Sequence, residues 1–217
     1  MGKRTETDPR TRILDAAEDA IAEQGFAGAS LRDIVAAARV NLATVYYYFR
    51  SKRGLLEAVL TRRLGPLREE HMVLLRQFED EAKGRPLAVQ KILEAMLRPP
   101  LRLAAQAPAK HQAVTRLLGR IVTEPTPVIQ EVVRRQRQEV RDAFLRALQR
   151  SLPRMALPSL LWRIEFVWGA LAFTMCNPRK IELETKGACN PAHTEKVLAE
   201  MINFFSPGFE SRGPRKS

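Results

Sequence analysis

The sequence contains few of the residues that build disulfide frameworks, zinc sites or membrane spans. Its two cysteines, Cys176 and Cys189, have neither a CxxC pair nor a neighbouring histidine, which excludes the usual zinc spacings. The N-terminal segment has no apolar core of the kind that a signal peptide needs. The most apolar stretch, residues 160–176, contains charged residues and is short for a membrane span. We therefore interpret it as a buried helix and expect a reduced, cytoplasmic protein with no membrane association.

Signatures of common enzyme and cofactor sites are also missing. The sequence contains no glycine-rich phosphate loop and no nucleophile elbow. Its histidines, His71, His111 and His193, are scattered without metal or triad spacing. We expect no enzymatic activity, no metal and no cofactor.

The charge is strongly positive but unevenly distributed. The formal net charge is +12, with 12 Lys and Arg against 10 Asp and Glu in residues 1–70, and 24 against 14 in residues 71–217. A basic protein favours a polyanionic partner such as nucleic acid, yet net charge does not locate the binding site. A motif is needed to place it.

Helical periodicity dominates, and no segment alternates convincingly as a strand would, so we predict an all-α fold. Asp8 and Pro9 begin a first helix that Gly25 ends in a left-handed cap, and Ser30 begins a second. Asn41 caps a third helix over residues 42–48, and Ser51 a fourth from about residue 52, with a kink or break at Gly65-Pro66. Further helices are expected near residues 87–105, 111–122, 127–150, 159–177 and 191–205. These elements predict a three-helix DNA-binding domain over residues 1–52, a larger helical domain over residues 53–206 and a flexible tail over residues 207–217.

Residues 30–52, SLRDIVAAARVNLATVYYYFRSK, carry the clearest functional motif. Two short capped helices lie about three residues apart, which is the arrangement of a helix-turn-helix. Tyr46, Tyr47 and Tyr48 follow one another, and three consecutive positions of a helix point in different directions. A buried helix would have to find a partner for each hydroxyl, whereas on DNA the hydroxyls can bond phosphates and the rings can contact thymine methyl groups.

This segment resembles the tetracycline-repressor (TetR) family of bacterial regulators. The resemblance rests on Val40, Asn41, the run Tyr46-Tyr47-Tyr48-Phe49-Arg50-Ser51-Lys52 and the pair Leu55-Leu56, together with the upstream EQGFAGASLRDIVAAA. Arg39 departs from the pattern, because it stands where the family usually has a turn glycine. Either the turn has a different shape, or Arg39 accepts a strained conformation and adds a phosphate contact.

The resemblance implies a role for each residue of the motif. Base edges would be faced by Leu42, Ala43, Thr44 and Tyr47. The DNA backbone would be held by Tyr46, Tyr48 and Lys52. Ser30 and Arg32 would begin the bracing helix near DNA, and Asn41, at the start of the reading helix, would also lie at the DNA. Val40, Val45 and Phe49 would form core, although some of the tyrosines could instead pack between domains.

The larger domain would carry the dimer interface. The segment SLLWRIEFVWGALAFTM is apolar nearly all round, so it should be covered on more than one face. A partner subunit would supply the second cover, and the final helix would complete a four-helix interface. The residues predicted for it are Trp162, Gly169, Phe173, Met201 and Phe205. Ordinary core packing is the alternative.

We also expect a small-molecule inducer among the helices of residues 70–170. This region has more apolar side chains than a domain that only anchors the DNA-binding helices would need. They suggest an apolar or acyl ligand, bound by Leu97, Leu118, Phe144 and Phe166. A weaker similarity to a fatty-acid-responsive subgroup of the TetR family implies the same. Arg134, Arg137 and Arg141 share a helix face and either attract an anionic ligand or are simply solvated.

The function that these features predict is a homodimeric, ligand-responsive repressor that binds a palindromic operator in double-stranded DNA. The alternative is a helical small-molecule-binding protein or enzyme without sequence-specific DNA binding. The tyrosine-bearing helix favours the first, since the second class has no use for exposed tyrosines on a short capped helix.

Overall fold

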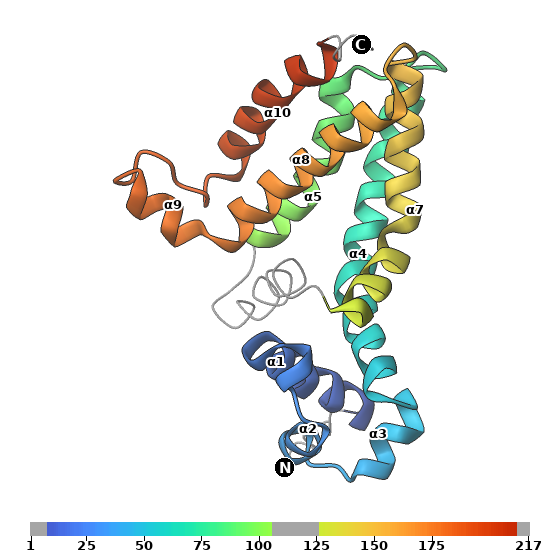
Figure 1. Ribbon diagram of the computed structural model, residues 1–217, viewed down its shortest axis with the longest axis vertical. Coiled ribbons are helices and arrows are strands. Elements are labelled where there is room, and N and C mark those ends of the chain that lie inside the picture. The colour runs from blue at the N-terminus through green and yellow to red at the C-terminus, as the bar shows by residue number, and fades with distance from the viewer. Residues whose placement is uncertain (1–7, 106–125, 212–217) are drawn as a thin grey trace, which may run out of the picture. The chain divides into compact units, whose positions relative to one another are not determined.

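The computed structural model describes residues 8–105 and 126–211, and these residues form helices and no strands (Figure 1). The helices are α1 (Pro9–Gly28), α2 (Leu31–Ala38), α3 (Leu42–Phe49), α4 (Lys52–Glu81), α5 (Val89–Ala105), α7 (Pro127–Ser151), α8 (Leu157–Cys176), α9 (Pro178–Glu184) and α10 (Thr194–Glu210). The all-α prediction is confirmed. The helix expected at residues 111–122 lies outside the described residues.

The described chain divides into two compact units. The first contains α1, α2, α3, the part of α4 up to Gly65 and the part of α7 up to Gln136. The second contains the rest of α4 and α7 with α5, α8, α9 and α10. The first unit therefore extends beyond residue 52, where the sequence suggested a boundary, because the start of α4 packs with the three N-terminal helices.

The first unit is held by a small apolar core between its short helices. Ile13 and Ala17 of α1, Ile34 of α2 and Val45 of α3 are almost completely shielded from solvent. Full burial contributes about 1.5–3 kcal/mol for each of Ile13, Ile34 and Val45, and about 0.8 kcal/mol for the single methyl group of Ala17. This packing fixes α3 against α1 and α2, so that the remaining faces of α3 point away from the core.

Gly25 interrupts the first helix at the expected place, but not as a left-handed cap. Its φ of 74° and ψ of 171° interrupt the helical conformation, and helical residues resume up to Gly28. A left-handed cap requires a ψ near 47°, so Gly25 forms a kink instead. The backbone N–H of Ala29 donates to the carbonyl of Gly25 at 3.0 Å and closes the segment after the kink.

Of the kink or break expected at Gly65-Pro66, a break is not found. α4 continues from Lys52 to Glu81 with Pro66 inside it. A proline in a helix removes one N–H donor and crowds the preceding turn, but it need not end a helix whose apolar residues are packed. Leu60 and Leu64 before the proline and Leu75 after it are buried. After α4 the chain turns at Lys83 and Gly84, which both have positive φ.

In the second unit α5 packs against both α8 and α10, which also contact each other (Figure 1). Ile92, Leu93, Met96 and Leu97 of α5 have no exposed surface. Two consecutive prolines, Pro99 and Pro100, lie inside α5 and are buried without ending it. This helix is therefore the centre of the second unit.

Two features at the C-terminal end differ from expectation. The seven-residue helix α9 was not predicted; none of its residues is buried, so it has no apolar periodicity to detect. α10 continues to Glu210, through four residues assigned to the tail, because Phe209 is 1% exposed and anchors its last turn.

Among the described helices, α8 is long and apolar enough to cross a membrane by length and composition, a test that core helices also pass. Only one side of it is buried in the chain, with Leu160, Ile164, Val167 and Leu171 shielded. Its opposite side is exposed. Ordinary core packing therefore covers one side of α8 within the single chain, and the cover expected from a partner subunit for the other side stays a prediction.

Candidate nucleic-acid interface

The second and third helices begin at side-chain caps. The Ser30 hydroxyl oxygen accepts from the backbone N–H of Arg32 at 3.1 Å. Asn41 Oδ1 accepts from the backbone N–H of Thr44 at 2.8 Å. Each cap satisfies one of the donors that a helix N-terminus leaves unpaired, a contribution of about 1 kcal/mol. Both caps confirm the sequence prediction and fix where the short helices start.

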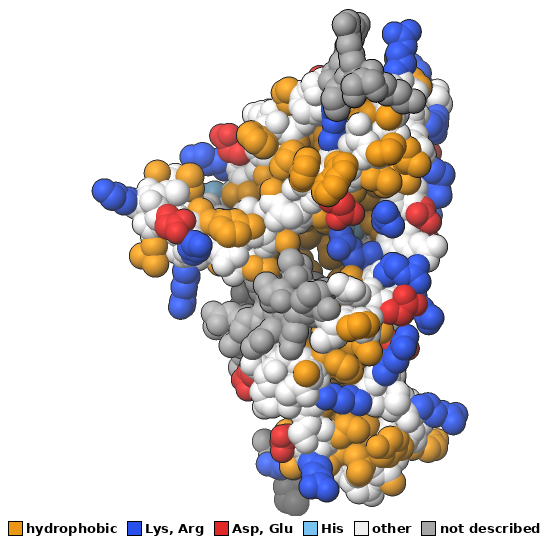
Figure 2. Space-filling model, viewed as in Figure 1, with side chains coloured by type: hydrophobic (Ala, Val, Ile, Leu, Met, Phe, Trp, Pro, Cys, Tyr) orange, Lys and Arg blue, Asp and Glu red, His pale blue; other side chains and the backbone are white. Residues whose placement is uncertain are grey.

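α3 has one buried side and an unusually aromatic exposed side. Val45 and Phe49, four residues apart, are 0% and 5% exposed and anchor the helix. Tyr47 is 78% exposed, and Tyr46 and Tyr48 are also exposed. Hydrophobic side chains, tyrosine included, gather over α3 in the space-filling view (Figure 2). We call this exposed surface, which consists of Tyr46, Tyr47 and Tyr48, the tyrosine face.

The tyrosine rings support one another. Tyr47 and Tyr48 meet edge to face with ring centroids 5.0 Å apart, and the Tyr48 ring is 6.1 Å from that of Phe49. Edge-to-face pairs stabilise each other by about 0.5–1.5 kcal/mol. Since Phe49 is buried, this row of rings connects the exposed Tyr47 to the core and restricts its orientations.

The turn between α2 and α3 has the conformation that glycine favours, although Arg39 occupies it. Arg39 has φ 53° and ψ 50°, which is left-handed. The Arg39 N–H donates to the Ala36 carbonyl at 3.2 Å, and the Val40 N–H to the Val35 carbonyl at 3.1 Å. This pair of bonds is a Schellman motif, which ends helices at a left-handed residue. The alternative of a differently shaped turn is thus wrong, and the Arg39 side chain is exposed.

A close backbone approach joins α3 to α4, and the sequence analysis did not detect it. A Cβ on Gly54 would lie 2.1 Å from the carbonyl oxygen of Phe49, so only glycine fits there. The Ser51 hydroxyl caps α4 as predicted by accepting from the Gly54 N–H at 3.0 Å. Arg50 turns the chain with φ 66°. The only sequence signal was a glycine in the first turn of a helix.

Lys52, expected to hold the DNA backbone, already has partners in the chain. Its Nζ donates to the Ala27 carbonyl at 3.3 Å and lies 4.8 Å from the centre of the Phe26 ring. An ammonium has three donors, so further ones remain for a phosphate. The structure therefore gives Lys52 a role in holding the end of α1 near the start of α4.

The remaining residues expected at DNA lie at or near the surface. Leu42 is 40% exposed, Ala43 and Arg32 are exposed, and Thr44 is half-buried. Val40, expected in the core, is half-buried. Short capped helices joined by a left-handed turn, with the second helix exposed, form a helix-turn-helix whose second helix can enter a major groove about 12 Å wide.

Comparison with protein families agrees with this geometry. Residues 13–59 match the family described as bacterial regulatory proteins, tetR family, and residues 94–208 match the tetracyclin repressor-like, C-terminal domain. The second match alone covers more than half of the chain. The chain belongs to the tetR family of bacterial regulatory proteins. The tetR family consists of regulators rather than enzymes, so the enzyme alternative has no support.

Individual relatives are more distant. The HTH-type transcriptional regulator UidR of Escherichia coli is 33% identical over 130 residues, covering 53% of this chain and 65% of UidR. The chain therefore spans less than two thirds of the length of this relative. A TetR-like transcriptional regulator from Rhodococcus has a TM-score of 0.63 at 17% identity, covering 97% of this chain and 100% of its own. FadR from Bacillus subtilis, solved in complex with stearoyl-CoA, has a TM-score of 0.55 at 16% identity, covering 91% and 98%. At these identities the solved structures show the tetR fold alone.

In this tetR-family chain, the residues expected in a dimer interface separate into two groups. Trp162, Gly169 and Phe173 of α8 are exposed, as is Phe166 between them. Met201 is 8% exposed and belongs to the core of its own chain, and Phe205 is half-buried. Its neighbour Phe204 is 77% exposed, which makes it the most accessible phenylalanine of α10.

The residues expected to bind ligand are not brought together. Leu97 and Phe144 are buried, with 0% and 1% exposure, whereas Phe166 is 59% exposed on the outer side of α8. Phe166 was assigned to the ligand because it is apolar, but helical spacing places it with Trp162 and Phe173. Leu118 lies outside the described residues.

A polar cluster near Phe144 was not anticipated. His71 of α4 is 3% exposed, and its Nε2 lies 3.0 Å from the carbonyl oxygen of Met96. Its ring meets those of Phe144 and Trp168 edge-on, at 5.6 Å and 6.2 Å between centroids. Burial lowers the pKa of His71 to about 4, so the ring is neutral at pH 7 and can donate one N–H to Met96.

The three arginines predicted to share a face of α7 have different surroundings. Arg134 forms a salt bridge with Glu131 at 2.9 Å. The Arg137 guanidinium lies 4.4 Å from the centre of the Trp168 ring, a cation–π contact. Arg141 is exposed. They do not converge as a single anion site.

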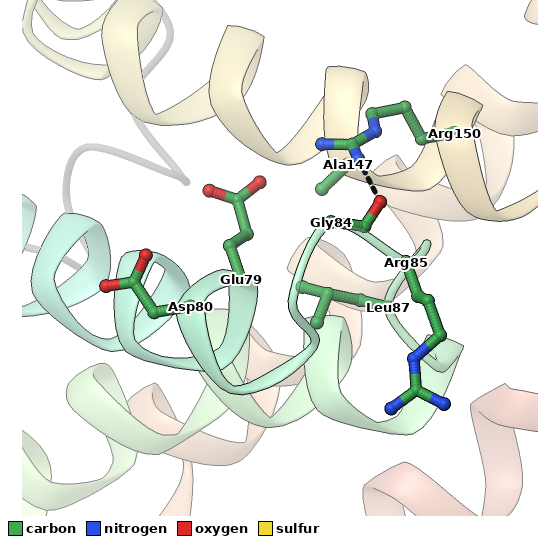
Figure 3. A pocket seen from close by; sticks show the side chains of 7 residues that line it. All are labelled: Glu79, Asp80, Gly84, Arg85, Leu87, Ala147 and Arg150. Atoms are coloured by element: carbon green, nitrogen blue, oxygen red, sulfur yellow. Dashed lines mark hydrogen bonds between the residues drawn. The ribbon is translucent and has the colours of Figure 1, made fainter.

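A small hollow lies where the turn after α4 meets the end of α7 (Figure 3). Its volume is about 190 Å³, and Arg150 crosses it to donate to the Gly84 carbonyl at 3.2 Å. Glu79, Asp80 and Arg85 also line it, so it is polar and highly charged. It does not resemble a site for the apolar ligand predicted from the sequence. Within the described ranges, no three His, Cys, Asp or Glu side chains are grouped to hold a metal ion.

Proposed function

We propose that the chain is a cytoplasmic, homodimeric repressor that binds palindromic duplex DNA through α3 and is released by a small apolar or acyl ligand. The observation that carries this proposal is the tyrosine face. Three adjacent aromatic side chains are exposed on an eight-residue helix that is capped at its start by Asn41 and anchored by Val45 and Phe49. Exposed aromatic surface of this extent suggests a partner.

Duplex DNA fits the chemistry of this face. Tyrosine hydroxyls can donate to phosphate oxygens, which accept only, and the rings can lie against sugars and thymine methyl groups. Leu42 and Ala43 at the start of α3 offer apolar contacts but no side-chain hydrogen bonds. Discrimination between DNA sequences would therefore depend on contacts with thymine methyl groups, on Tyr47 and Arg32, and on DNA shape.

The dimer proposal rests on the exposed side of α8. Trp162, Phe166, Gly169 and Phe173 recur at spacings of four, three and four, so they form one row along the helix. Its three aromatic side chains are 64%, 59% and 48% exposed in that order. Hydrophobic side chains gather over α8 in Figure 2. Such a row suits a two-fold interface, in which the same surface is used by both subunits. Gly169 has open space around it and would permit close approach of a partner helix.

The ligand proposal is the least specific. A ligand can release DNA only by binding the DNA-incompetent dimer more tightly than the competent one. FadR, which shares the fold, was solved with stearoyl-CoA. An acyl ligand is therefore a reasonable first probe, and the positive charge beyond residue 70 would suit its phosphates.

Selection from a random duplex pool tests the DNA proposal directly. We expect an enriched sequence with two related half-sites whose centres lie about one helical turn apart. A pool that yields no enriched sequence, or an asymmetric one bound by a single chain, would contradict the proposal.

The dimer is tested by Phe166→Glu, which places a charge in the aromatic row. We expect this variant to sediment as a monomer where the wild type sediments as a dimer. Leu183→Glu is the matched control, because Leu183 is 77% exposed on α9 and lies outside the row. Equal sedimentation of all three would argue against an α8 interface.

The inducer class is tested by titrating palmitoyl-CoA and palmitate separately against the DNA complex. Release by the thioester alone would indicate that the phosphates are recognised, and release by both would indicate that the acyl chain suffices. If neither releases DNA, the acyl ligand is wrong.

A further inference from the structure

α1 contains a buried carboxylate. Glu18 has a side chain that is 3% exposed, next to the core residues Ala17 and Ile21. A carboxylate removed from water is strongly destabilising unless charged hydrogen-bond donors surround it. The position therefore requires partners that stay in place.

Two consecutive arginines of α4 provide those partners. Arg62 Nη2 donates to Glu18 Oε2 at 2.5 Å, and Arg63 Nε donates to Glu18 Oε1 at 2.7 Å. Arg62 also donates from Nη1 to Asp15 at 2.6 Å, and the carboxylate of Asp15 is 59% exposed. Both oxygens of Glu18 are thus held from one helix turn of α4. Among the described side chains, Arg62 Nε is buried without a hydrogen-bond partner. The exposed ion pair with Asp15 contributes little to stability, so Glu18 is the partner that holds Arg62 in place.

The same helix also holds the turn before α3. Arg12 Nε donates to the carbonyl oxygen of Ala38 at 3.1 Å, and Ala38 directly precedes the left-handed Arg39. Arg12, Asp15 and Glu18 are spaced by three residues, so they lie along one side of α1 within two turns. α1 is therefore attached at one end to the turn that sets the position of α3 and further along to α4.

These contacts lie within one compact unit. Residues 52–65 of α4 cluster with α1, α2 and α3, and the helix passes into the second unit only at Pro66. The described ion pairs between α4 and α1 are those of Arg62 and Arg63 with Asp15 and Glu18. Apolar contacts alone would hold the two helices together, but directional charged hydrogen bonds also restrict the angle between them.

We propose that Glu18 is a positioning residue for DNA binding: by holding Arg62 and Arg63 it fixes the start of α4 to the helix-turn-helix, and so sets the separation of the two α3 helices in the dimer. This inference rests on the proposed function, because a separation matters only when two subunits read two half-sites. A subunit that lacks the contacts of Glu18 with Arg62 and Arg63 still presents the tyrosine face. The two faces are then no longer held at one spacing.

The test compares one half-site with two. Glu18→Gln keeps the size of the side chain and removes its charge, and Asp15→Asn is the matched control, since it alters the exposed partner of the same Arg62. We expect Glu18→Gln to lower affinity for the two-half-site duplex about tenfold, within the usual range of coupling between sites. Affinity for a duplex with one half-site should stay within about twofold of wild type, as should both affinities of Asp15→Asn.

A merely structural role gives a different result. If Glu18 only stabilises the unit, Glu18→Gln lowers the affinity for both duplexes equally, and that result would overturn the inference, as would no loss on either. Should Glu18→Gln fail to fold, Arg63→Gln is the decisive variant, because Arg62 still neutralises Glu18 in it. A smaller loss of affinity that is confined to the two-half-site duplex supports the inference. An equal loss of affinity for both duplexes overturns it. A wild-type chain that binds no duplex would overturn the proposed function together with this inference.

Discussion

Asn41 and Thr44 form a closed pair at the start of α3. Asn41 Oδ1 accepts both from the backbone N–H of Thr44 and from its hydroxyl, each at 2.8 Å. The hydroxyl proton of Thr44 is therefore already used, and its oxygen remains as an acceptor. Against DNA, Thr44 can accept from a base amino group more readily than it can donate to a phosphate.

Asn41→Ala should destabilise the chain by about 1 kcal/mol, because it removes the cap and frees the Thr44 hydroxyl. Asn41→Asp should retain that stability, since aspartate caps equally well, but should weaken DNA binding by placing a negative charge near the phosphates. Urea unfolding and a duplex titration of both variants check this. Equal DNA affinity for Asn41→Asp and wild type would place Asn41 away from the DNA.

Lys52→Ala should weaken binding to all duplexes alike and reduce the slope of log affinity against log salt by about one, if Lys52 contacts one phosphate. It should also lower the free energy of unfolding by about 0.5–1 kcal/mol, because the contact with Phe26 is lost. Lys196→Ala, an exposed lysine of α10, is the control. An unchanged salt slope would leave Lys52 a purely structural residue.

Arg39 provides a test of backbone strain. Arg39→Gly should leave the free energy of unfolding within about 0.5 kcal/mol of wild type, because relief of the left-handed strain offsets the added freedom of the unfolded chain. Arg39→Val should cost roughly 1–2 kcal/mol more than Arg39→Gly, since a β-branched side chain tolerates positive φ poorly. Equal stability of the two variants would mean that the turn is not left-handed.

His71 should make stability dependent on pH. Its pKa is lowered by burial to about 4 from 6.5, so the unfolded chain binds a proton that the folded chain excludes. Its contribution is fully present above pH 6.5 and is lost as pH falls from 6.5 through 4, by at most about 1.4 kcal/mol per pH unit. His71→Phe should be less sensitive to acid than wild type in urea unfolding at pH 7 and pH 5. His193→Asn, which changes an exposed histidine, is the control and should behave as wild type. If His71→Phe loses as much stability between pH 7 and pH 5 as wild type does, His71 is not the source of the acid sensitivity.

Local chemistry explains which features the sequence could predict. The caps at Ser30, Asn41 and Ser51 depend on one side chain and a nearby N–H, so they are legible in the sequence and all three are confirmed. The continuity of α4 through Pro66 depends on the packing of apolar residues on both sides of the proline, which no local pattern records.

Residues far apart in the chain explain the rest. Glu18 reads as one more polar residue of an amphipathic helix, and only folding brings Arg62 and Arg63 to it. Phe166 and Met201 were both recognised as apolar, but apolarity does not tell an exposed row from a core. The structure reverses their assignments, with Phe166 exposed and Met201 buried.

The central claim is that the tyrosine face reads DNA. It is tested most directly by measuring the affinity of wild type and of Tyr47→Ala for two duplexes: the selected duplex, and a scrambled duplex of equal length and composition. We predict that Tyr47→Ala loses roughly 1–3 kcal/mol of the preference for the selected duplex and binds the scrambled one nearly as wild type does. Leu183→Ala, which truncates a side chain of similar exposure on α9, should retain the full preference. A wild-type chain with no preference between the duplexes, or a Tyr47→Ala variant that keeps it, would contradict the claim.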